Sequence, residues 1–397
     1  MTQADVIVIG GGISGLSFAY AMANSGLSVQ ILESAKRLGG CIDTRHTDDG
    51  FWFEMGAHTA YNSYGGLIDM IEGCNLKDTL LQRSKVPFRM LRGGALRSVM
   101  KELSLWRVLL SVPRVFGASK DESTVREYYS KLVGAKNYER VLSPFLAAVP
   151  SQSADGFPAT MLFKKRARRK DIMRSFTLQD GLSSLVEGIA QHPGISVATH
   201  TVTSVEGKGK GDDFSVTAAD GERFRAPFVA LATPPSASAS IVQEAHPQLA
   251  QELAGIKTVP VESVGVVVAS DKLSIEPVAG IVPAKDIFYS AVTRDVVPDP
   301  KFRAFTFHFK SGQNIDQRLE RIAEVLGVAR DDLKEVFEKT ATLPAPALGH
   351  QTIVAAIDSA VSGTRLAVTG NYFGGLALED CISRSRSESS RLLAMSA

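Results

Sequence analysis

The sequence predicts an α/β fold, because each end of the chain reads as a buried strand, a glycine turn and a helix. The first such stretch is "VIVIGGGISGLSF" from Val6, and the second is "RLAVTGNYFGGLALEDCI", which ends at Ile382. Between the two, helix-rich and strand-rich stretches alternate several times. These three observations favour one discontinuous, Rossmann-like nucleotide-binding domain with an inserted mixed-sheet domain and a helical subdomain.

The amino-acid composition is typical of an ordinary globular protein. It has 397 residues, 44% hydrophobic and 22% charged, with a net charge of +2, so no global field predicts a nucleic-acid partner. Cys41, Cys74 and Cys381 are too widely spaced for a disulfide framework or a metal knuckle, and they suit a reducing, cytoplasmic location. The seven histidines are scattered, and we expect no metal site.

The first strands and helix are predicted from short-range pattern. Residues 6–9 are a continuous apolar run, as in a strand buried on both faces. Residues 13–24 repeat apolar side chains at helical spacing, and Gly26 closes that helix. A second buried strand is expected at 28–32, which completes the start of a βαβ unit.

The rest of the chain divides where the pattern changes. A hairpin is expected within 81–99, helices from 101 to about 169, and a glycine turn into a helix at 177–190. Strands are expected at 195–199, 202–206, 214–218, 228–232, 263–269, 287–292 and 303–309, with helices over about 315–339. The predicted parts are 1–80, 177–235 and 351–397 for the nucleotide-binding domain, 81–176 for a mainly helical substrate or cap region, and 236–350 for a substrate domain.

The first glycine turn has the spacing Gly10-x-Gly12-x-x-Gly15 between a strand and a helix. Glycines there permit a tight turn and a close approach of the backbone to a pyrophosphate, and the helix N-terminus favours its charge. Glu33 ends the next strand and is placed to accept hydrogen bonds from ribose hydroxyls. The alternative, a purely structural turn with a surface glutamate, explains less of this context.

A second glycine pair distinguishes between nucleotide cofactors. Glu33 is followed by Arg37 and by Gly39-Gly40, which would let the backbone approach the cofactor again. A simple NAD dehydrogenase has no use for this extra turn, so the pattern favours FAD. Arg37 either faces the pyrophosphate or is a solvated charge, and the second interpretation leaves the glycine pair unexplained.

In these residues the chain resembles the flavin amine oxidase and protoporphyrinogen oxidase superfamily. The resemblance continues through residues 123–163, through "LQDGLSSLVEGIA" (178–190) and through "GNYFGGLALEDCI" (370–382), so it covers most of the chain. It implies an FAD-binding domain of the GR2 type. It also implies non-covalent FAD, because no cysteine stands where covalent amine oxidases attach their flavin.

The resemblance implies where the cofactor lies along the chain. Residues 10–15 would meet the pyrophosphate, Glu33 the adenosine ribose, and the backbone of Val202 the adenine. Cys41 stands where amine oxidases often have Arg, so one flavin contact differs here. The segment "EMGAH" (54–58) matches one that passes near the flavin in the family.

The C-terminal motif would form the other wall of the same site. Asn371 matches a position beside the pyrophosphate and ribityl chain. A helix beginning near Ala377 would stabilise negative charge on a reduced flavin by roughly 0.3–1 kcal/mol. The full set of implied cofactor residues is Gly10, Gly11, Gly12, Ile13, Ser14, Gly15, Glu33, Ser34, Arg37, Gly39, Gly40, Cys41, Gly56, Ala57, His58, Thr59, Val202, Asn371, Leu376, Ala377 and Leu378.

Hydride transfer to a flavin needs a positioned substrate and a dry site, and no nucleophilic triad. The polar candidates are His58, Tyr61, Tyr372 and His308. His58 either acts through its side chain or touches the cofactor through its backbone alone. Tyr61 lines the substrate cavity or belongs to a surface loop, and Tyr372 is an aromatic wall or core. His308 alternates with Phe307 and Phe309 on a strand, so it faces away from them.

Two further stretches have open interpretations. "KKRARRK" (164–170) holds six basic residues in seven and is typical of a solvated helix face, although it would also attract an anionic substrate or an acidic membrane surface. "LSLWRVLLSV" (103–112) is either core or an interfacial helix. We therefore expect a cytoplasmic protein, with peripheral contact to the inner face of a membrane as the alternative.

The sequence predicts an FAD-dependent oxidoreductase that dehydrogenates a small molecule, an amine or a porphyrinogen-like tetrapyrrole, with O2 or another acceptor reoxidising the flavin. One alternative is a flavin reductase or monooxygenase fed by NAD(P)H, for which no second strand-borne GxGxxG is present. Another is a non-catalytic flavoprotein that binds a membrane or partner through residues 164–170. The sequence predicts no oligomeric state.

Overall fold

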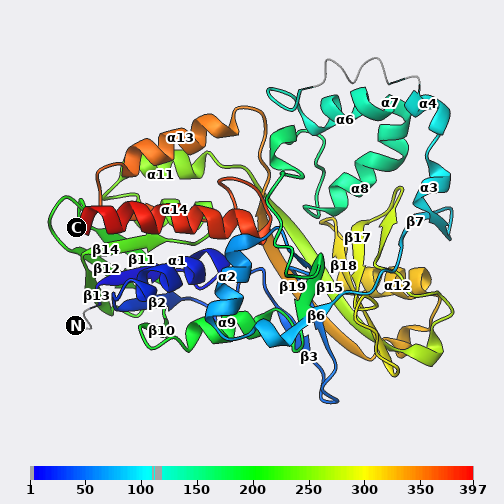
Figure 1. Cartoon of the computed structure of the whole chain (residues 1–397), viewed down its shortest axis with the longest axis horizontal. Coiled ribbons are helices and arrows are strands. Elements are labelled where there is room, and N and C mark those ends of the chain that lie inside the picture. Colours follow the sequence, from blue (N-terminus) through cyan, green and yellow to red (C-terminus); the bar gives the residue numbers. More distant parts are fainter. Residues whose placement is uncertain (1–3, 110, 112–118, 397) are drawn as a thin grey trace.

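The computed structural model describes residues 4–109, 111 and 119–396. Figure 1 shows a nucleotide-binding half, in which both termini lie, beside a second half built on a large sheet with helices above it. The predicted α/β class is confirmed.

A parallel five-stranded sheet forms the centre of the first half. Its order is β10-β2-β1-β14-β20, and every neighbouring pair is parallel. The sheet thus unites strands from the beginning, middle and end of the chain. Its members are β1 (Val6–Ile9), β2 (Val29–Glu33), β10 (Ile195–Thr199), β14 (Phe228–Leu231) and β20 (Leu366–Val368).

Both faces of this sheet are covered. Val6 and Val8 pack with one set of helices, whereas Ile7 and Ile9 pack with the elements on the opposite face, as expected for alternating side chains. The first face holds α1 (Ile13–Asn24), α9 (Ser183–Ala190) and α14 (Leu378–Ser396). The second holds β11 (Val202–Glu206), β12 (Phe214–Ala218), β13 (Arg223–Ala226), α10 (Pro235–Val242), α11 (Pro247–Ala254) and α13 (His350–Val361).

The second half is built on a mixed seven-stranded sheet of order β19-β15-β18-β17-β16-β7-β8. Only the pairing of β16 with β7 is parallel. Phe305, Phe307 and Phe309 bury one face of β18 in a core shared with α12. The elements are β7 (Phe88–Arg92), β8 (Ala95–Ser98), β15 (Thr258–Ala269), β16 (Gly280–Pro283), β17 (Phe288–Thr293), β18 (Phe302–Phe309), β19 (Glu335–Pro344) and α12 (Ile315–Leu326).

The helix expected to reach residue 339 was wrong in its second half. Helix α12 ends at Leu326, where Gly327 adopts a left-handed φ of 68°. Residues 335–344 instead form β19, which pairs with β15 from Glu335 to Pro344 and alternates between half-buried and exposed positions. Glutamate and lysine favour helices, but here Glu338 takes an exposed position of the strand and the half-buried Lys339 pairs with Asp43. Pairing with β15 therefore overrides the local preference.

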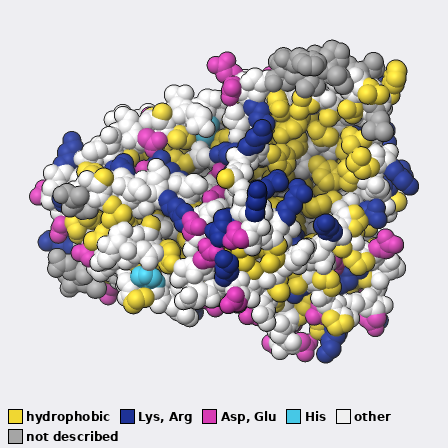
Figure 2. Space-filling model, viewed as in Figure 1, with side chains coloured by type: hydrophobic (Ala, Val, Ile, Leu, Met, Phe, Trp, Pro, Cys, Tyr) yellow, Lys and Arg dark blue, Asp and Glu magenta, His cyan; other side chains and the backbone are white. Residues whose placement is uncertain are grey.

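A helical subdomain sits above the large sheet (Figure 1), and Figure 2 shows hydrophobic side chains gathered over this region. Its elements are α3 (Val99–Glu102), α4 (Leu105–Leu109), α6 (Val125–Val133), α7 (Ala135–Asn137), the π-helical turn η2 (Tyr138–Leu142) and α8 (Ser143–Ala148). In the stretch 103–112, Trp106 and Leu109 are 69% and 61% exposed, so neither is core. Residues 110 and 112 of that stretch lie outside the described residues.

Small elements connect the two halves. The sheet β5-β9-β6 and the hairpin β3-β4 carry the loops between the nucleotide-binding half and the large sheet. These elements are β3 (Thr44–His46), β4 (Trp52–Glu54), β5 (Ala60–Tyr61), α2 (Gly65–Gly73), β6 (Leu80–Gln82) and β9 (Ser175–Leu178). None of the helices among the described residues combines the length and apolarity needed to cross a membrane.

Candidate functional site

The first glycine turn is packed too tightly for any side chain. Gly10 has a φ of 104°, and a Cβ on Gly15 would lie 1.9 Å from the carbonyl oxygen of Gly10. Helix α1 starts at Gly12 without a side-chain cap and without an acid in its first turn. Its N-terminus therefore has backbone N–H groups that suit an anion, which fits the pyrophosphate of a dinucleotide.

Glu33 lies against this turn, as the motif requires. Its carboxylate accepts the N–H of Gly11 at 2.6 Å and the N–H of Ala35 at 2.8 Å, and the Ser34 hydroxyl donates to it at 3.2 Å. The N–H of His200 donates to the Glu33 carbonyl at 2.9 Å, which brings the segment leading to Val202 alongside. The predicted ribose and adenine positions are therefore neighbours, and their cofactor contacts stay predictions.

The second glycine loop packs directly on the first. The N–H of Gly39 donates to the carbonyl of Gly11 at 2.8 Å, and a Cβ on Gly40 would lie 3.1 Å from the Cα of Gly12. A Cβ on Gly56 would lie 2.1 Å from the carbonyl oxygen of Cys41. Three backbone segments thus approach one another more closely than side chains allow, which explains the otherwise unused glycine pair.

Arg37 shapes this loop and is not a free solvated charge. Its guanidinium donates to the carbonyls of Leu38 at 2.7 Å, Gly40 at 2.9 Å and Ile42 at 2.6 Å. It also lies 3.4 Å from a carboxylate oxygen of Asp43. The side chain is therefore engaged with the protein, and its predicted contact with a pyrophosphate stays a prediction.

Hydrogen bonds join the C-terminal turn to the first helix. The Ser385 hydroxyl in α14 donates to the carbonyl of Ser14 at 2.8 Å and lies 2.7 Å from the Thr369 hydroxyl. A Cβ on Gly375, whose φ is 151°, would lie 2.5 Å from a carboxylate oxygen of Asp380, so the turn also favours glycine here. The two glycine motifs therefore meet at the same end of the parallel sheet. Of the residues predicted there, Asn371, Leu376 and Ala377 are half-buried and Leu378 is buried.

The first turn of α14 anchors two other segments. The Glu379 carboxylate accepts the N–H groups of Gly66 at 2.8 Å and Leu67 at 3.1 Å, which caps α2. Burial raises the pKa of Glu379, and those hydrogen bonds oppose the shift. Asp380 accepts hydrogen bonds from Arg166 at 2.6 Å and Lys164 at 3.2 Å.

The helix-face interpretation of residues 164–170 was therefore wrong. Residues 164–169 are irregular and run past α14 and α2. Lys164 and Arg166 pair with Asp380, and Arg169 pairs with Glu72 and Asp171. Half of the basic side chains thus have acidic partners, so the segment is not a freely solvated face.

Two of the predicted polar candidates, His58 and His308, lie side by side. Their Nε2 atoms are 3.2 Å apart, and His308 Nδ1 is 2.8 Å from the hydroxyl oxygen of Ser263. Burial lowers the pKa of His308 to about 4, and the charge of Lys339 adds to this. Burial also lowers the pKa of His58, with smaller effects from His308 and Arg83. Both imidazoles are consequently neutral at ordinary pH.

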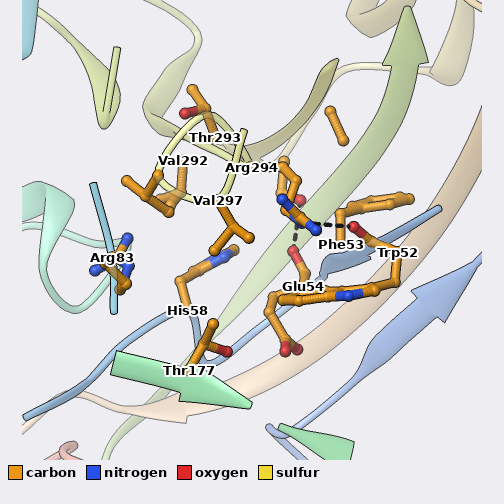
Figure 3. A pocket seen from close by; sticks show the side chains of 13 residues that line it. Trp52, Phe53, Glu54, His58, Arg83, Thr177, Val292, Thr293, Arg294 and Val297 are labelled. Atoms are coloured by element: carbon orange, nitrogen blue, oxygen red, sulfur yellow. Dashed lines mark hydrogen bonds between the residues drawn. The ribbon is translucent and has the colours of Figure 1, made fainter. Parts of the chain in front are cut away.

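His58 lines a pocket between β4, β9 and the segment after β17 (Figure 3), with a cavity volume of about 20 Å³. Glu54 also lines it, accepting the N–H of Leu182 at 2.8 Å and the Thr44 hydroxyl at 3.0 Å. Burial raises the pKa of Glu54 to about 7. Arg294 lies over the Trp52 ring at 4.2 Å and donates from Nε to the Trp52 carbonyl at 3.0 Å.

The other two polar candidates lie elsewhere. Tyr61 is 42% exposed and packs edge-on against Tyr64 at 5.5 Å, in agreement with the surface-loop interpretation. Tyr372 is 1% exposed and belongs to the core that contains Ile7 and Ile9. The aromatic-wall interpretation of Tyr372 was therefore wrong, because apolar packing beside the parallel sheet takes up its ring.

Sequence reasoning missed several polar residues near the histidine pair. Lys339 donates from Nζ to the Gly40 carbonyl at 2.9 Å and lies 2.8 Å from an Asp43 carboxylate oxygen. It was missed because its strand was expected to be helix. Arg83 donates to the Thr59 hydroxyl, and no short motif marks it. Glu54 begins "EMGAH", so its position in that motif was a signal that went unused.

Comparison with known proteins agrees with this arrangement. The family model for flavin containing amine oxidoreductases matches residues 13–272. The chloroplastic protoporphyrinogen oxidase of Nicotiana tabacum is 29% identical over 161 residues, which cover 37% of this chain and 29% of that protein. A 4,4'-diaponeurosporene oxygenase of Staphylococcus aureus is 49% identical over 51 residues, 13% of this chain and 10% of that protein. The chain thus spans about 30% or less of the length of these curated relatives.

Solved structures share the fold along almost the whole chain. A candidate protoporphyrinogen oxidase from Exiguobacterium sp. 255-15 has a TM-score of 0.79 at 18% identity, with 99% of each chain covered. Cyclohexylamine oxidase from Brevibacterium oxydans has a TM-score of 0.73 at 14% identity, again with 99% of each chain covered. The predicted resemblance and FAD cofactor are confirmed. With well over half of its residues matched by the family model, the chain belongs to the flavin-containing amine oxidoreductases, which are FAD-dependent enzymes.

Proposed function

We propose that this enzyme dehydrogenates a small molecule that carries an oxidisable C–N or adjacent C–C bond, either an amine or a porphyrinogen-like tetrapyrrole. Bound FAD supplies N5 as the hydride acceptor, and O2 or another acceptor reoxidises it. The single observation that carries the proposal is the neutral histidine pair beside the glycine loops. His58 follows Gly56 and Ala57 directly, and the N–H of Ala57 donates to the Cys41 carbonyl at 2.8 Å.

The histidine pair can hold and move a proton. Oxidation of an amine or a pyrrolic carbon removes a hydride together with a proton from nitrogen, so the site needs a neutral acceptor. His58 and His308 share one hydrogen between their Nε2 atoms, and the Ser263 hydroxyl extends this chain through His308 Nδ1. A proton accepted at His58 can therefore be delocalised along the chain.

The surroundings favour a dry site. Leu376, in the C-terminal motif, packs against the apolar cluster of the helical subdomain that contains Leu146 and Phe157. Hydrophobic side chains gather over that subdomain, with Lys and Arg side chains at the rim (Figure 2). Exclusion of water strengthens the electrostatic interactions that act on the substrate and protects the reduced cofactor.

The comparisons support both substrate classes. The sequence relative from tobacco is named a protoporphyrinogen oxidase, and the structural neighbour from Brevibacterium is named a cyclohexylamine oxidase. The similarity to the former covers only part of that protein, and the latter shares mainly the fold.

The test is anaerobic mixing of the purified FAD-loaded protein with a panel of amines and with protoporphyrinogen, monitored by bleaching of the visible flavin band. We expect rapid bleaching by at least one substrate, and slower bleaching in His58→Gln with unchanged flavin content. NADPH is the comparison reagent. Rapid bleaching by NADPH, with none by the amines or protoporphyrinogen, would contradict the proposal and favour the reductase alternative.

A further inference from the structure

We propose that a cationic groove at the far end of the large sheet binds an organic phosphate. The groove lies where the β7-β8 hairpin meets α3, the turn η2 and the C-terminal end of α12, and its cavity volume is about 850 Å³. Figure 1 shows β7, α3 and α12 at the end of the molecule away from both termini, whereas the glycine turns belong to the half that holds the termini. The groove is therefore a second site, and the proposal does not rest on the proposed function.

A single buried carboxylate holds three arginines together at this groove. The side chain of Glu102, in α3, is only 4% exposed. Its carboxylate oxygens lie 3.0 Å from Arg92 Nε, 3.7 Å from Arg97 Nη1 and 2.9 Å from Arg140 Nη2. Three guanidinium groups therefore share one negative charge, which leaves two positive charges in excess. Arg97 and Arg140 both line the groove, so this excess charge faces it.

The other charged residues of the groove do not cancel this excess. Lys101 is exposed and lines the groove, and no acid pairs with it among the residues that the structure describes. Arg89 also lines it, 3.6 Å from Glu276, whose side chain is 84% exposed. The remaining acid of the groove, Glu324, lies 2.5 Å from Arg321. Every acid that lines the groove thus faces an arginine already, and Lys101 adds a further unpaired charge.

The backbone departs from regular α-helix at the residue that brings Arg140 to the groove. Arg140 belongs to η2, a π-helical turn between α7 and α8, and such turns occur frequently at functional sites. In this turn Tyr138 is buried and its hydroxyl donates to Asp155, whereas Arg140 donates from Nη2 to Glu102 at 2.9 Å. The same turn therefore anchors an aromatic ring inside the helical subdomain and directs a guanidinium group to the groove.

Size, apolar surface and charge together indicate the class of ligand. A groove of this volume suits a small organic molecule. The half-buried side chains of Leu96 and Ile275 line it and pack on the core of the large sheet, so they offer apolar surface to the organic part. A phosphate monoester carries nearly two negative charges at pH 7, and guanidinium groups bind its oxygens through paired N–H donors. The two excess charges around Glu102 therefore match a phosphate better than a carboxylate, which carries one.

The test is titration calorimetry at low ionic strength with phenyl phosphate and its uncharged counterpart phenol. The protein is loaded with FAD, so that the cofactor occupies the glycine turns. We expect phenyl phosphate to bind and phenol to bind at least about 10-fold more weakly, and Arg97→Gln or Lys101→Gln to weaken phenyl phosphate binding by about 10-fold. Arg225→Gln is the matched control, because it removes the same charge from an exposed arginine of β13, and it should leave binding unchanged.

Both groove variants should fold. Arg97 makes the longest of the three contacts with Glu102, so Arg92 and Arg140 keep that carboxylate paired in Arg97→Gln, and Lys101→Gln breaks no ion pair among the described residues. Flavin content and thermal unfolding verify this. The proposal is overturned if phenyl phosphate does not bind, if phenol binds as tightly, or if neither groove variant weakens binding. Because the measurement needs no turnover, its result is separate from any test of substrate oxidation.

Discussion

His58 Nε2 lies 3.2 Å from His308 Nε2, although 250 residues separate them in the sequence. His308 belongs to the large sheet and His58 to the loop that follows β4, so this contact joins the two halves of the molecule. It requires that at least one of the two imidazoles is neutral, because two imidazolium groups at this distance would repel each other. Proton occupancy therefore links chemistry at the site to the stability of the fold.

Replacement of His308 by Gln should make the free energy of unfolding depend less on pH between pH 6.5 and 4. The pKa of His308 is about 4 in the folded protein and 6.5 ordinarily, so the unfolded chain binds more protons between these values. The free energy of unfolding therefore has its full value, as far as His308 is concerned, above pH 6.5. It falls as the pH drops through 4, by on the order of 3 kcal/mol in total. Urea unfolding from pH 6.5 to 4 measures this, and parallel curves for wild type and variant would contradict it.

Glu54 should produce a pH dependence of opposite sign. Its pKa is about 7 when folded and 4.5 ordinarily, so the folded protein binds more protons in this window. The contribution of Glu54 to the free energy of unfolding is fully present below pH 4.5. It is lost as the pH rises through 7, and it is again on the order of 3 kcal/mol. Glu54→Gln should remove this loss in thermal unfolding across the window. Glu276→Gln, at an exposed carboxylate, is the control and should behave as the wild type.

Gly15→Ala should abolish FAD binding. The added Cβ would lie 1.9 Å from the Gly10 carbonyl oxygen, so helix α1 must move away from the turn that faces the cofactor. The flavin-to-protein absorbance ratio after purification and an FAD titration both report this loss. Gly156→Ala is the matched control, because a Cβ there meets no atom within 4 Å. FAD binding unchanged in Gly15→Ala would contradict the assigned role of the turn.

Asp380→Ala should loosen the basic segment and destabilise the protein. The Asp380 side chain is 9% exposed and pairs with Arg166 and Lys164, so its removal leaves two cations without their acid. Loss of one partner from a largely buried ion pair costs about 3–5 kcal/mol. Urea unfolding measures the destabilisation, and trypsin should cut within residues 164–170 faster than in the wild type. Lys165→Ala alters an exposed residue of that segment and should leave urea unfolding unchanged.

Local patterns in the sequence predicted the parts of the fold that depend on near neighbours. The apolar run of β1, the helical spacing of α1 and the glycine turns were confirmed, because each element depends on its own side chains and backbone. The local pattern was misleading where pairing with a distant segment determines the secondary structure. An example is β19, whose pairing with β15 overrides a composition that favours a helix. The short helices α10, α11 and α13 went unpredicted for a related reason, since packing on the parallel sheet stabilises them.

The candidate site shows the same division. Spacing alone predicted the tight packing at Gly10 to Gly15 and at the second glycine pair, which the structure shows. Their contacts with the cofactor, and that of Glu33, stay predictions. Only the tertiary structure paired His58 with His308 and buried Tyr372 in the core. The burial of a side chain and the identity of its hydrogen-bond partner depend on contacts between segments that can be hundreds of residues apart. Those contacts set the pKa values of His58 and His308, on which the proposed proton transfer depends.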